Sequence, residues 1–263
     1  MSSIEVHDLI KKFGDLAVVK KISFSVDEGD IFAFLGPNGA GKTTTIRMLT
    51  TLLRPTSGQI RLNGVDPVAY QDEARRLFGI VFQDPSLDDE LTALENLEFH
   101  GVLYRVPRAL RRTRIEQLMN IVELWDRRND VVKHFSGGMR RRLEIARGLI
   151  HHPKILFLDE STIGLDPQTR NHIWGYIQSL NKEEGITVFF TTHYMEEADR
   201  VARHIAVIDH GSIVAQGHSD ELKKMTNTSS LEDAFLSLTG KSIREESAES
   251  VDHLRMHARV WRR

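Results

Sequence analysis

The sequence predicts an α/β fold with a mostly parallel sheet core, an antiparallel β edge subdomain and an α-helical insertion. Short apolar runs are each followed by a glycine-rich or acidic turn and then by a helical pattern, as in a parallel sheet covered by helices. Near the start of the chain the apolar residues alternate with polar ones instead. From about residue 84 to residue 152 the strand signals stop and helical patterns replace them.

The expected core strands are short runs in which nearly every residue is apolar, as strands buried on both faces should be. They are Ile31 to Leu35, Ile155 to Leu158, Thr187 to Phe190 and Ile205 to Ile208. The antiparallel edge is assigned to Ile4 to Leu9 and to Ile22 to Val26, the second of which alternates with serines. Asn63-Gly64, after Gln59 to Leu62, indicates a hairpin turn.

Within the helical insertion, five apolar residues recur at helical spacing and predict one buried face: Ile115, Leu118, Met119, Val122 and Trp125. The basic residues around them are interpreted as a solvated helix face: Arg105, Arg108, Arg111, Arg112 and Arg114. Near the other end of the chain, the apolar spacing predicts an amphipathic helix over residues 231–239 that ends at Gly240. Residues 241–263 are polar and mixed in charge, and we expect a mobile tail.

Composition limits the possible functions. The 263 residues include 35 Lys and Arg against 37 Asp and Glu, a near balance that argues against nucleic-acid binding. The chain has no cysteine, which excludes disulfides, a thiolate nucleophile and cysteine-ligated metals. Neither a secretory signal nor a run of about 18 apolar residues is apparent. A role at a membrane would therefore require docking onto another chain.

A phosphate-binding loop is the strongest motif. Directly between the apolar run 31–35 and a helical run 44–53, the pattern G-x-x-x-x-G-K-[ST] is matched by Gly36, Pro37, Asn38, Gly39, Ala40, Gly41, Lys42 and Thr43. Glycines let backbone N–H groups wrap a polyphosphate at a helix N-terminus, the lysine reaches the β and γ phosphates, and the threonine hydroxyl can ligate Mg²⁺. The alternative, an ordinary glycine turn, does not explain the strand before it and the helix after it.

Two further segments carry chemistry. The run 155–158 ends in Asp159 and Glu160, at the carboxyl end of a strand where open α/β sheets bind ligands. Asp159 would help to hold Mg²⁺, and Glu160 would orient or deprotonate the attacking water. Ser136, Gly137 and Gly138 open another helix, with the serine as N-cap and the glycines leaving the N–H groups open to an anion. Each segment alone could be a simple strand end or a capped helix.

In this order the motifs resemble the ATP-binding subunit of an ABC transporter over roughly residues 1–225, with a helical subdomain at about 84–152 and residues 226–263 as a C-terminal extension. The resemblance implies a P-loop NTPase fold of ABC type and the cofactors ATP and Mg²⁺. It makes Phe13 the adenine platform and places the Walker A loop from Gly36 to Thr44. It also implies that Gln83 contacts Mg²⁺ and water and lies in a loop that touches the membrane subunit. The remaining assignments are the signature Ser136 to Gly138, the Mg²⁺ aspartate Asp159, the catalytic Glu160, Asp166 in the D-loop and the switch histidine His193.

The chain departs from the family pattern at three positions. Phe135 and Met139 flank the signature glycines where leucine and glutamine are usual, and Ser161 stands where proline commonly follows the catalytic glutamate. Ser161 could loosen the turn that leads to the D-loop. The variant signature, the stretch 162–170 and the stretch 231–240 resemble the daunorubicin-resistance type of exporter ATPase. That likeness implies an ABC-2 type membrane permease as partner and export of a hydrophobic drug, antibiotic or lipid-like compound.

The expected mechanism is a head-to-tail homodimer in which each ATP lies between the Walker motifs of one chain and Ser136 to Gly138 of the other. Such a chain would be cytoplasmic, peripheral on the inner face of the cell membrane through the permease. The alternatives are an ABC ATPase acting on DNA or ribosomes and a regulator that binds nucleotide without hydrolysing it. DNA-organising relatives have long coiled coils between the residues that correspond to Gln83 and Ser136. Here these two residues are 53 positions apart, without sustained heptads between them. Ribosome-associated relatives normally carry two cassettes in one chain, and this chain has one.

Overall fold

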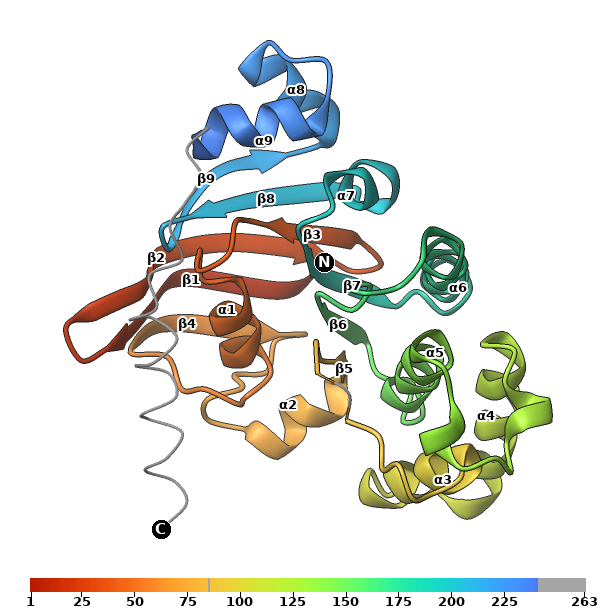
Figure 1. Ribbon diagram of the computed structural model, residues 1–263. Helices are drawn as coiled ribbons and strands as arrows, with labels where there is room; N and C mark the ends of the chain where they lie inside the picture. Colours follow the sequence, from red (N-terminus) through yellow and green to blue (C-terminus); the bar gives the residue numbers. More distant parts are fainter. Residues whose placement is uncertain (85, 241–263) are drawn as a thin grey trace.

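The computed structural model describes residues 1–84 and 86–240, and within that part of the chain it forms a six-stranded sheet and a three-stranded sheet (Figure 1). The six-stranded sheet has the order β5-β6-β7-β3-β8-β9. Its first five strands in this order are parallel, and β9 is antiparallel to β8. The strands are β3 (Ile31–Leu35), β5 (Phe78–Val81), β6 (Ile155–Asp159), β7 (Thr187–Thr192), β8 (His204–Asp209) and β9 (Ser212–Gly217). The predicted α/β class and mostly parallel core are confirmed.

The central sheet is buried on both faces, which explains its apolar runs. In β3, Ile31, Ala33 and Leu35 belong to one hydrophobic cluster, while Phe32 and Phe34 belong to the other. Because successive side chains point to opposite faces of a strand, each face of the sheet has its own core. Two strands, β5 and β9, were not expected from the sequence. Both are short, and β9 has only one buried residue, Ala215.

The antiparallel sheet has the order β2-β1-β4 and packs against one face of the central sheet. Its strands are β1 (Ser2–Phe13), β2 (Leu16–Asp27) and β4 (Ser57–Leu62), so β1 and β2 are longer than the predicted segments. Asn63 and Gly64 both have positive φ, and Leu62 and Val65 exchange backbone hydrogen bonds across them. The predicted turn is confirmed, but β4 ends there and no named strand follows it directly.

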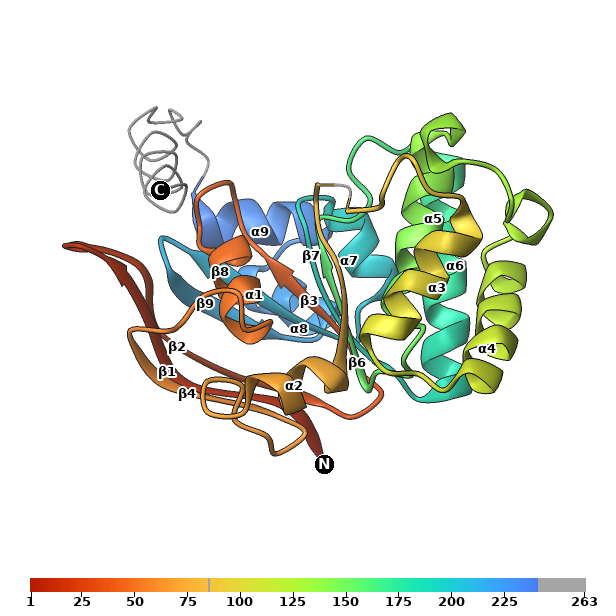
Figure 2. The same ribbon diagram turned by 90° about the horizontal axis from the view of Figure 1, so that it is seen from below.

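The helices lie on both sides of the central sheet. Seen from below, the antiparallel sheet with α1 and α2 lies on one side and α3 to α6 on the other (Figure 2). The helices are α1 (Lys42–Leu49), α2 (Gln71–Leu77), α3 (Ala93–Leu103), α4 (Arg108–Ile121), α5 (Gly137–Gly148), α6 (Pro167–Glu184), α7 (Met195–Val201), α8 (Ser219–Thr226) and α9 (Leu231–Thr239). Between β5 and β6 the named elements are α3, α4, two short 3-10 helices and α5, as the predicted helical insertion requires.

The expected apolar face of the insertion is not one continuous helix. Ile115, Leu118 and Met119 are buried on α4, but the helix ends at Ile121, and Trp125 belongs to a following 3-10 helix (Trp125–Arg127). The backbone leaves the helix at Glu123, which has φ of 54°, and Trp125 still packs on the same core.

The expected solvated basic face was wrong at two residues, Arg111 and Arg114. Arg105, Arg108 and Arg112 are exposed. Arg111 is only 13% exposed and pairs with Glu98. Arg114 is buried and forms a bidentate pair with Glu184 at the end of α6, with distances of 2.8 and 2.7 Å. The carboxylate compensates the charge that burial would otherwise leave isolated.

The predicted C-terminal helix is α9, capped by Ser230, whose hydroxyl accepts a hydrogen bond from the Asp233 N–H. Leu231 and Ala234 are buried, and the helix ends before Gly240. The expected tail at 241–263 lies outside the described residues. The domain division at residue 225 falls near the end of α8 and remains a proposal. No helix in the described ranges is long and apolar enough to cross a membrane.

Candidate functional site

Four predicted motifs meet at one edge of the central sheet. The strands β5, β6, β7 and β3 are neighbours in this order and run parallel, so their carboxyl ends lie side by side. These ends lead to Gln83, to Asp159 and Glu160, to His193, and to the loop 36–41. Segments that are far apart in the sequence therefore reach the same site through the strand order.

The loop between β3 and α1 is built to present backbone N–H groups. Gly41 is the N-cap of α1 and has φ of 109°, a conformation that favours glycine. The carbonyl of Ala40 accepts a hydrogen bond of 3.0 Å from the N–H of Gly211 in the β8–β9 turn, which fixes the loop against the sheet. The first N–H groups of α1 have no partners within the helix and attract anions.

Lys42 lies beneath this loop as a buried cation. Its side chain is 5% exposed, and Nζ donates to the carbonyl of Gly36 at 2.7 Å and to that of Pro37 at 3.3 Å. Nζ also lies 3.2 Å from Oε1 of Glu160. The ammonium is therefore held between the phosphate loop and the end of β6, where an entering phosphate would find it.

Asp159 and Thr43 provide oxygen atoms suited to a hard cation. The Thr43 hydroxyl donates to Oδ1 of Asp159 at 3.5 Å, and the Thr191 hydroxyl donates to the same oxygen at 2.7 Å. Burial raises the pKa of Asp159 above its ordinary value; the Glu160 charge adds to this, while the two hydroxyls oppose it. Mg²⁺ binds through one or two carboxylates together with substrate phosphates, so this oxygen pair beside the loop fits it.

Glu160 connects Lys42 to His193. Its Oε2 lies 3.7 Å from Nδ1 of His193, whose side chain is 42% exposed. The backbone of Glu160 has φ of 46°, and its N–H donates to the carbonyl and the hydroxyl of Thr191 at 3.2 and 3.0 Å. A left-handed conformation at a residue other than glycine stores strain, which is typical of functional sites. The carboxylate is thus fixed between a cation and an imidazole that reaches the surface.

Ser136 to Gly138 form a second group of residues. The Ser136 hydroxyl caps α5 by accepting a hydrogen bond of 3.3 Å from the Met139 N–H. A Cβ on Gly138 would lie 2.8 Å from Cγ2 of Thr169, so the start of α5 is packed on the start of α6. Asp166 caps α6 by accepting from the N–H and the hydroxyl of Thr169 at 2.9 and 2.7 Å. Among the described residues, no hydrogen bond or ion pair connects this group to the loop 36–44.

The loop that carries Gln83 is held by α5. Arg141 donates to the carbonyls of Phe82 and Gln83, and it pairs with Glu144, whose carboxylate accepts from the N–H of Ser86 at 2.7 Å. The Gln83 side chain is exposed beyond the end of β5. The same helix that begins at Ser136 therefore positions this loop.

Phe13 lies at the end of β1 and is partly buried. Its ring lies 5.0 Å from Nζ of Lys11. The structure thus places Phe13 on the antiparallel sheet, and the contact with adenine stays a prediction.

Sequence reasoning missed the residues that support the site. Thr191, Arg141 and Glu144 are of this kind, and all three are nearly or fully buried. A threonine pair that follows the apolar run 187–190 was a usable signal for Thr191, because polar residues at the carboxyl end of a buried strand point to a site. The charged pair on α5 left no such signal, since its partner is a loop backbone.

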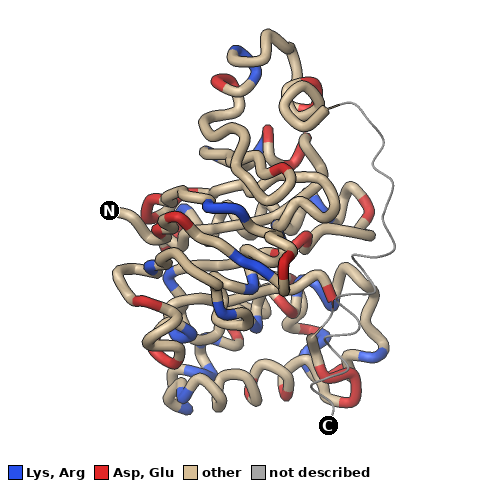
Figure 3. Tube along the Cα trace, turned by 90° about the vertical axis from the view of Figure 1, so that its left-hand side faces the viewer, with Lys and Arg blue, Asp and Glu red and all other residues tan. Residues whose placement is uncertain are grey.

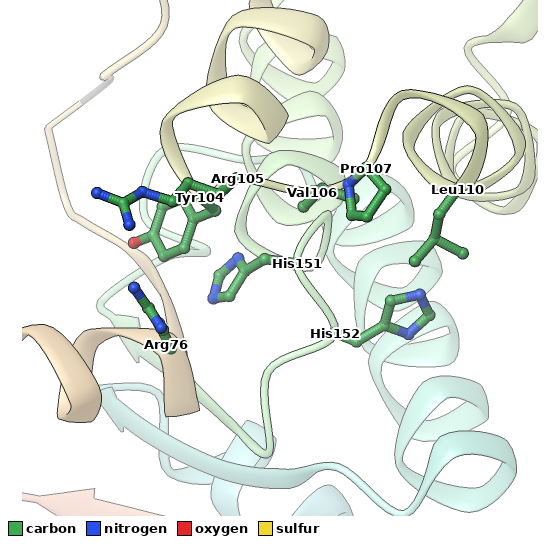
Figure 4. Close-up of a pocket in the computed structure, with 8 residues that line it drawn as sticks. All are labelled: Arg76, Tyr104, Arg105, Val106, Pro107, Leu110, His151 and His152. Carbon is green, nitrogen blue, oxygen red and sulfur yellow. The ribbon is translucent and has the colours of Figure 1, made fainter.

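Two cavities lie away from the phosphate loop, between the helical insertion and the core. One has a volume of about 220 Å³, and Figure 4 shows Arg76, Tyr104 and His151 around it. The other has a volume of about 250 Å³, shares Tyr104 and reaches Phe82 and Ser86 of the Gln83 loop. Neither is lined by Lys42, Asp159 or Glu160.

Comparisons with known proteins agree with this geometry. The ABC transporter family model matches residues 19–163. The chain is 44% identical to a daunorubicin/doxorubicin resistance ATP-binding protein of Streptomyces peucetius, over 84% of this chain and 67% of that protein. It is 43% identical to the Nod factor export ATP-binding protein I of Ralstonia nicotianae, over 83% of this chain and 68% of that protein.

Among solved structures, the chain resembles a dimeric ATP-binding cassette in a post-hydrolysis state bound to ADP and Pi, with a TM-score of 0.73 and 29% identity over 82% of this chain and 98% of that one. The family model covers more than half of the chain, and its motifs lie on the strand ends described above. The chain belongs to the ABC transporter family and is an ATP-binding ATPase of that family.

Proposed function

We propose that this ATPase powers a separate membrane permease and works as a homodimer that binds ATP between its two chains. The observation that carries the proposal is the arrangement at the sheet edge, where Lys42 lies 3.2 Å from Glu160 and Thr43 lies 3.5 Å from Asp159. The arrangement supplies a cation for the phosphates, oxygen ligands for a metal and a carboxylate for the attacking water.

Residue roles follow from these contacts. Thr43 and Asp159, with Gln83 from the adjoining loop, would hold Mg²⁺, which neutralises charge on the phosphate oxygens when it is bound. Lys42 would exchange its carbonyl and carboxylate contacts for phosphate oxygens. Glu160 would take the proton of the attacking water, and His193, 3.7 Å away, would contact the γ-phosphate and keep this carboxylate in place.

The homodimer explains why one chain contains two separate groups of site residues. Ser136 to Gly138 form a helix N-terminus suited to an anion, with open space next to Gly137, but they are not linked to the loop 36–44 of their own chain. A second chain placed head to tail would bring its signature segment over the phosphates. The related cassette with ADP and Pi is a dimer, which supports this proposal.

We infer an exporter of a hydrophobic drug, antibiotic or lipid-like compound, with an ABC-2 type permease as partner and a cytoplasmic location at the inner face of the membrane. The support is the sequence similarity to one relative that is named for drug resistance and to another that is named for export. Phe82 and Gln83, whose carbonyls are held by Arg141, and the adjoining cavities lie at the border of the helical insertion. This region is the proposed permease contact.

A role on DNA or on ribosomes is the less favoured alternative. Lys and Arg are interspersed with Asp and Glu along the part of the chain that Figure 3 colours, and the formal charge is −2. Nucleic-acid binding normally needs a concentrated basic surface. Stimulation of ATP hydrolysis by RNA or DNA would favour this alternative.

The test of the proposed function is purification of the full chain from membranes, followed by transport in vesicles. We expect co-purification of a multi-span membrane protein and ATP-dependent transport that Glu160→Gln abolishes. A chain that hydrolyses ATP but never associates with a membrane protein would contradict the proposed permease partner. A chain that binds ATP and releases no phosphate would instead support the non-hydrolysing regulator.

A further inference from the structure

A buried carboxylate near the site has no role in the account above. Glu197 lies on α7, four residues after His193, and is 3% exposed. Its Oε2 accepts hydrogen bonds from the hydroxyls of Thr162 at 3.0 Å and Thr192 at 2.9 Å, and its Oε1 lies 3.5 Å from Nε of Arg170. Burying a carboxylate is costly unless it is paired, and here the partners come from three different segments.

The contact with Thr192 fixes the turn that carries His193. A hydroxyl has one hydrogen, and Thr192 donates it to Glu197. The lone pairs of the Thr192 oxygen remain free, and this oxygen accepts a hydrogen bond of 3.0 Å from the N–H of Tyr194. The Glu197 carboxylate therefore orients the Thr192 hydroxyl. The hydrogen bond from the Tyr194 N–H to that hydroxyl closes the turn around His193, the residue between them.

The other two partners lie in or beside the segment between Glu160 and Asp166. Thr162 is two residues after Glu160, and Arg170 donates from Nη2 to the carbonyl of Leu165 at 3.3 Å. The guanidinium carbon of Arg170 also lies 4.1 Å from the Tyr194 ring centroid, and that ring lies 4.3 Å from the His193 ring. The two segments are thus joined both by the buried carboxylate and by the arginine at its edge.

We propose that Glu197 is a positioning residue that locks the turn at His193 to the segment from Glu160 to Asp166, through Thr192, Thr162 and Arg170. A displacement of either segment then moves the other, so that the imidazole and the carboxylate of Glu160 keep one mutual geometry. The inference rests on the proposed roles of Glu160 and His193 in hydrolysis.

Glu197→Gln tests the link in the full chain. The amide oxygen can still accept both hydroxyls, but the amide NH₂ then faces the Arg170 guanidinium, donor against donor. We expect kcat for ATP hydrolysis to fall about tenfold, while KM changes less than about twofold, because misplacement affects the reacting geometry and leaves the phosphate loop intact. Glu184→Gln is the matched control, since it breaks a carboxylate–arginine pair at the C-terminal end of α6, whereas Asp166 caps the other end of α6 and Thr192 is the last residue of β7, and it should keep the parent kcat.

A smaller change guards against a folding defect. Thr162→Val removes one hydroxyl next to Glu197 and keeps the shape, whereas Thr162→Ser retains the donor. We expect kcat to fall in the valine variant and to stay within about twofold of the parent in the serine variant. Equal kcat in both variants and in the parent would overturn the proposal.

Amide hydrogen exchange of the nucleotide-free chain tests the link without turnover. In Glu197→Gln, exchange should become faster in both residues 161–166 and residues 191–195, and in Glu184→Gln it should match the parent there. Faster exchange in only one segment, or in neither, would overturn the link. If the parent itself releases no phosphate, the proposed function fails, and this exchange comparison still decides the inference.

Discussion

Replacing Glu160 by glutamine should separate ATP binding from ATP hydrolysis. The amide keeps the side-chain size but removes the negative charge 3.2 Å from Nζ of Lys42. Two unit charges at that separation attract by about 5 kcal/mol at an effective dielectric constant of about 20, and desolvation offsets most of this. If a net Lys42–Glu160 attraction of about 1.4 kcal/mol remains in the parent, the phosphates of ATP must break it when they bind. The variant lacks this attraction, so its Kd for MgATP should be about tenfold lower.

Hydrolysis should change in the opposite direction. A positioned general base contributes about 10² to 10⁴-fold in rate, so phosphate release should fall at least about 100-fold. Equilibrium binding of a fluorescent ATP analogue and a phosphate-release assay measure the two effects, with Glu184→Gln as the control. Phosphate release at the parent rate, or weaker binding of MgATP than in the parent, would refute the reasoning.

Three further predictions concern buried ionisable groups. Lys42→Ala loses a charge-assisted phosphate contact worth about 1.5–3 kcal/mol, so calorimetry should show Kd for ATP raised about 10- to 100-fold, and unaltered affinity would contradict it. Because burial raises the pKa of Asp159, its charged form opposes folding at neutral pH; nucleotide-free Asp159→Asn should have a higher Tm than the parent at pH 7, and this gain should shrink toward pH 4. Burial lowers the pKa of His100 to about 3 and that of His151 to about 4, so unfolding takes up protons below about pH 6.5. Stability to urea should therefore fall as pH drops from 6.5 toward 4, with a smaller fall in His100→Phe, and an equal fall in both chains would count against burial as the cause.

The sequence was sufficient for the parts of the fold that depend on local pattern. The run 31–35 is β3 residue for residue, and the helix that Ser136 was expected to cap starts at Gly137, with Ser136 as its N-cap. Buried strands and amphipathic helices carry their periodicity in the chain itself. Short edge elements such as β9 do not, because one buried residue gives no pattern.

Long-range partners could not be predicted for the same reason. Arg114 belonged to a basic run, and only the packing of α4 on α6 reveals that Glu184 neutralises it. Glu197 follows Glu196 in the sequence, and its burial depends on threonines 5 and 35 positions away. The sequence identifies the residue types that form the site, whereas the fold determines which charged side chains lie in contact.

A crystal structure of Glu160→Gln with MgATP tests the central claim most directly. The account predicts two chains related head to tail, with each γ-phosphate contacted by Lys42 of one chain and by the Ser136 hydroxyl and Gly138 N–H of the other. A nucleotide enclosed entirely by one chain, with both signature segments turned away from it, would contradict the account.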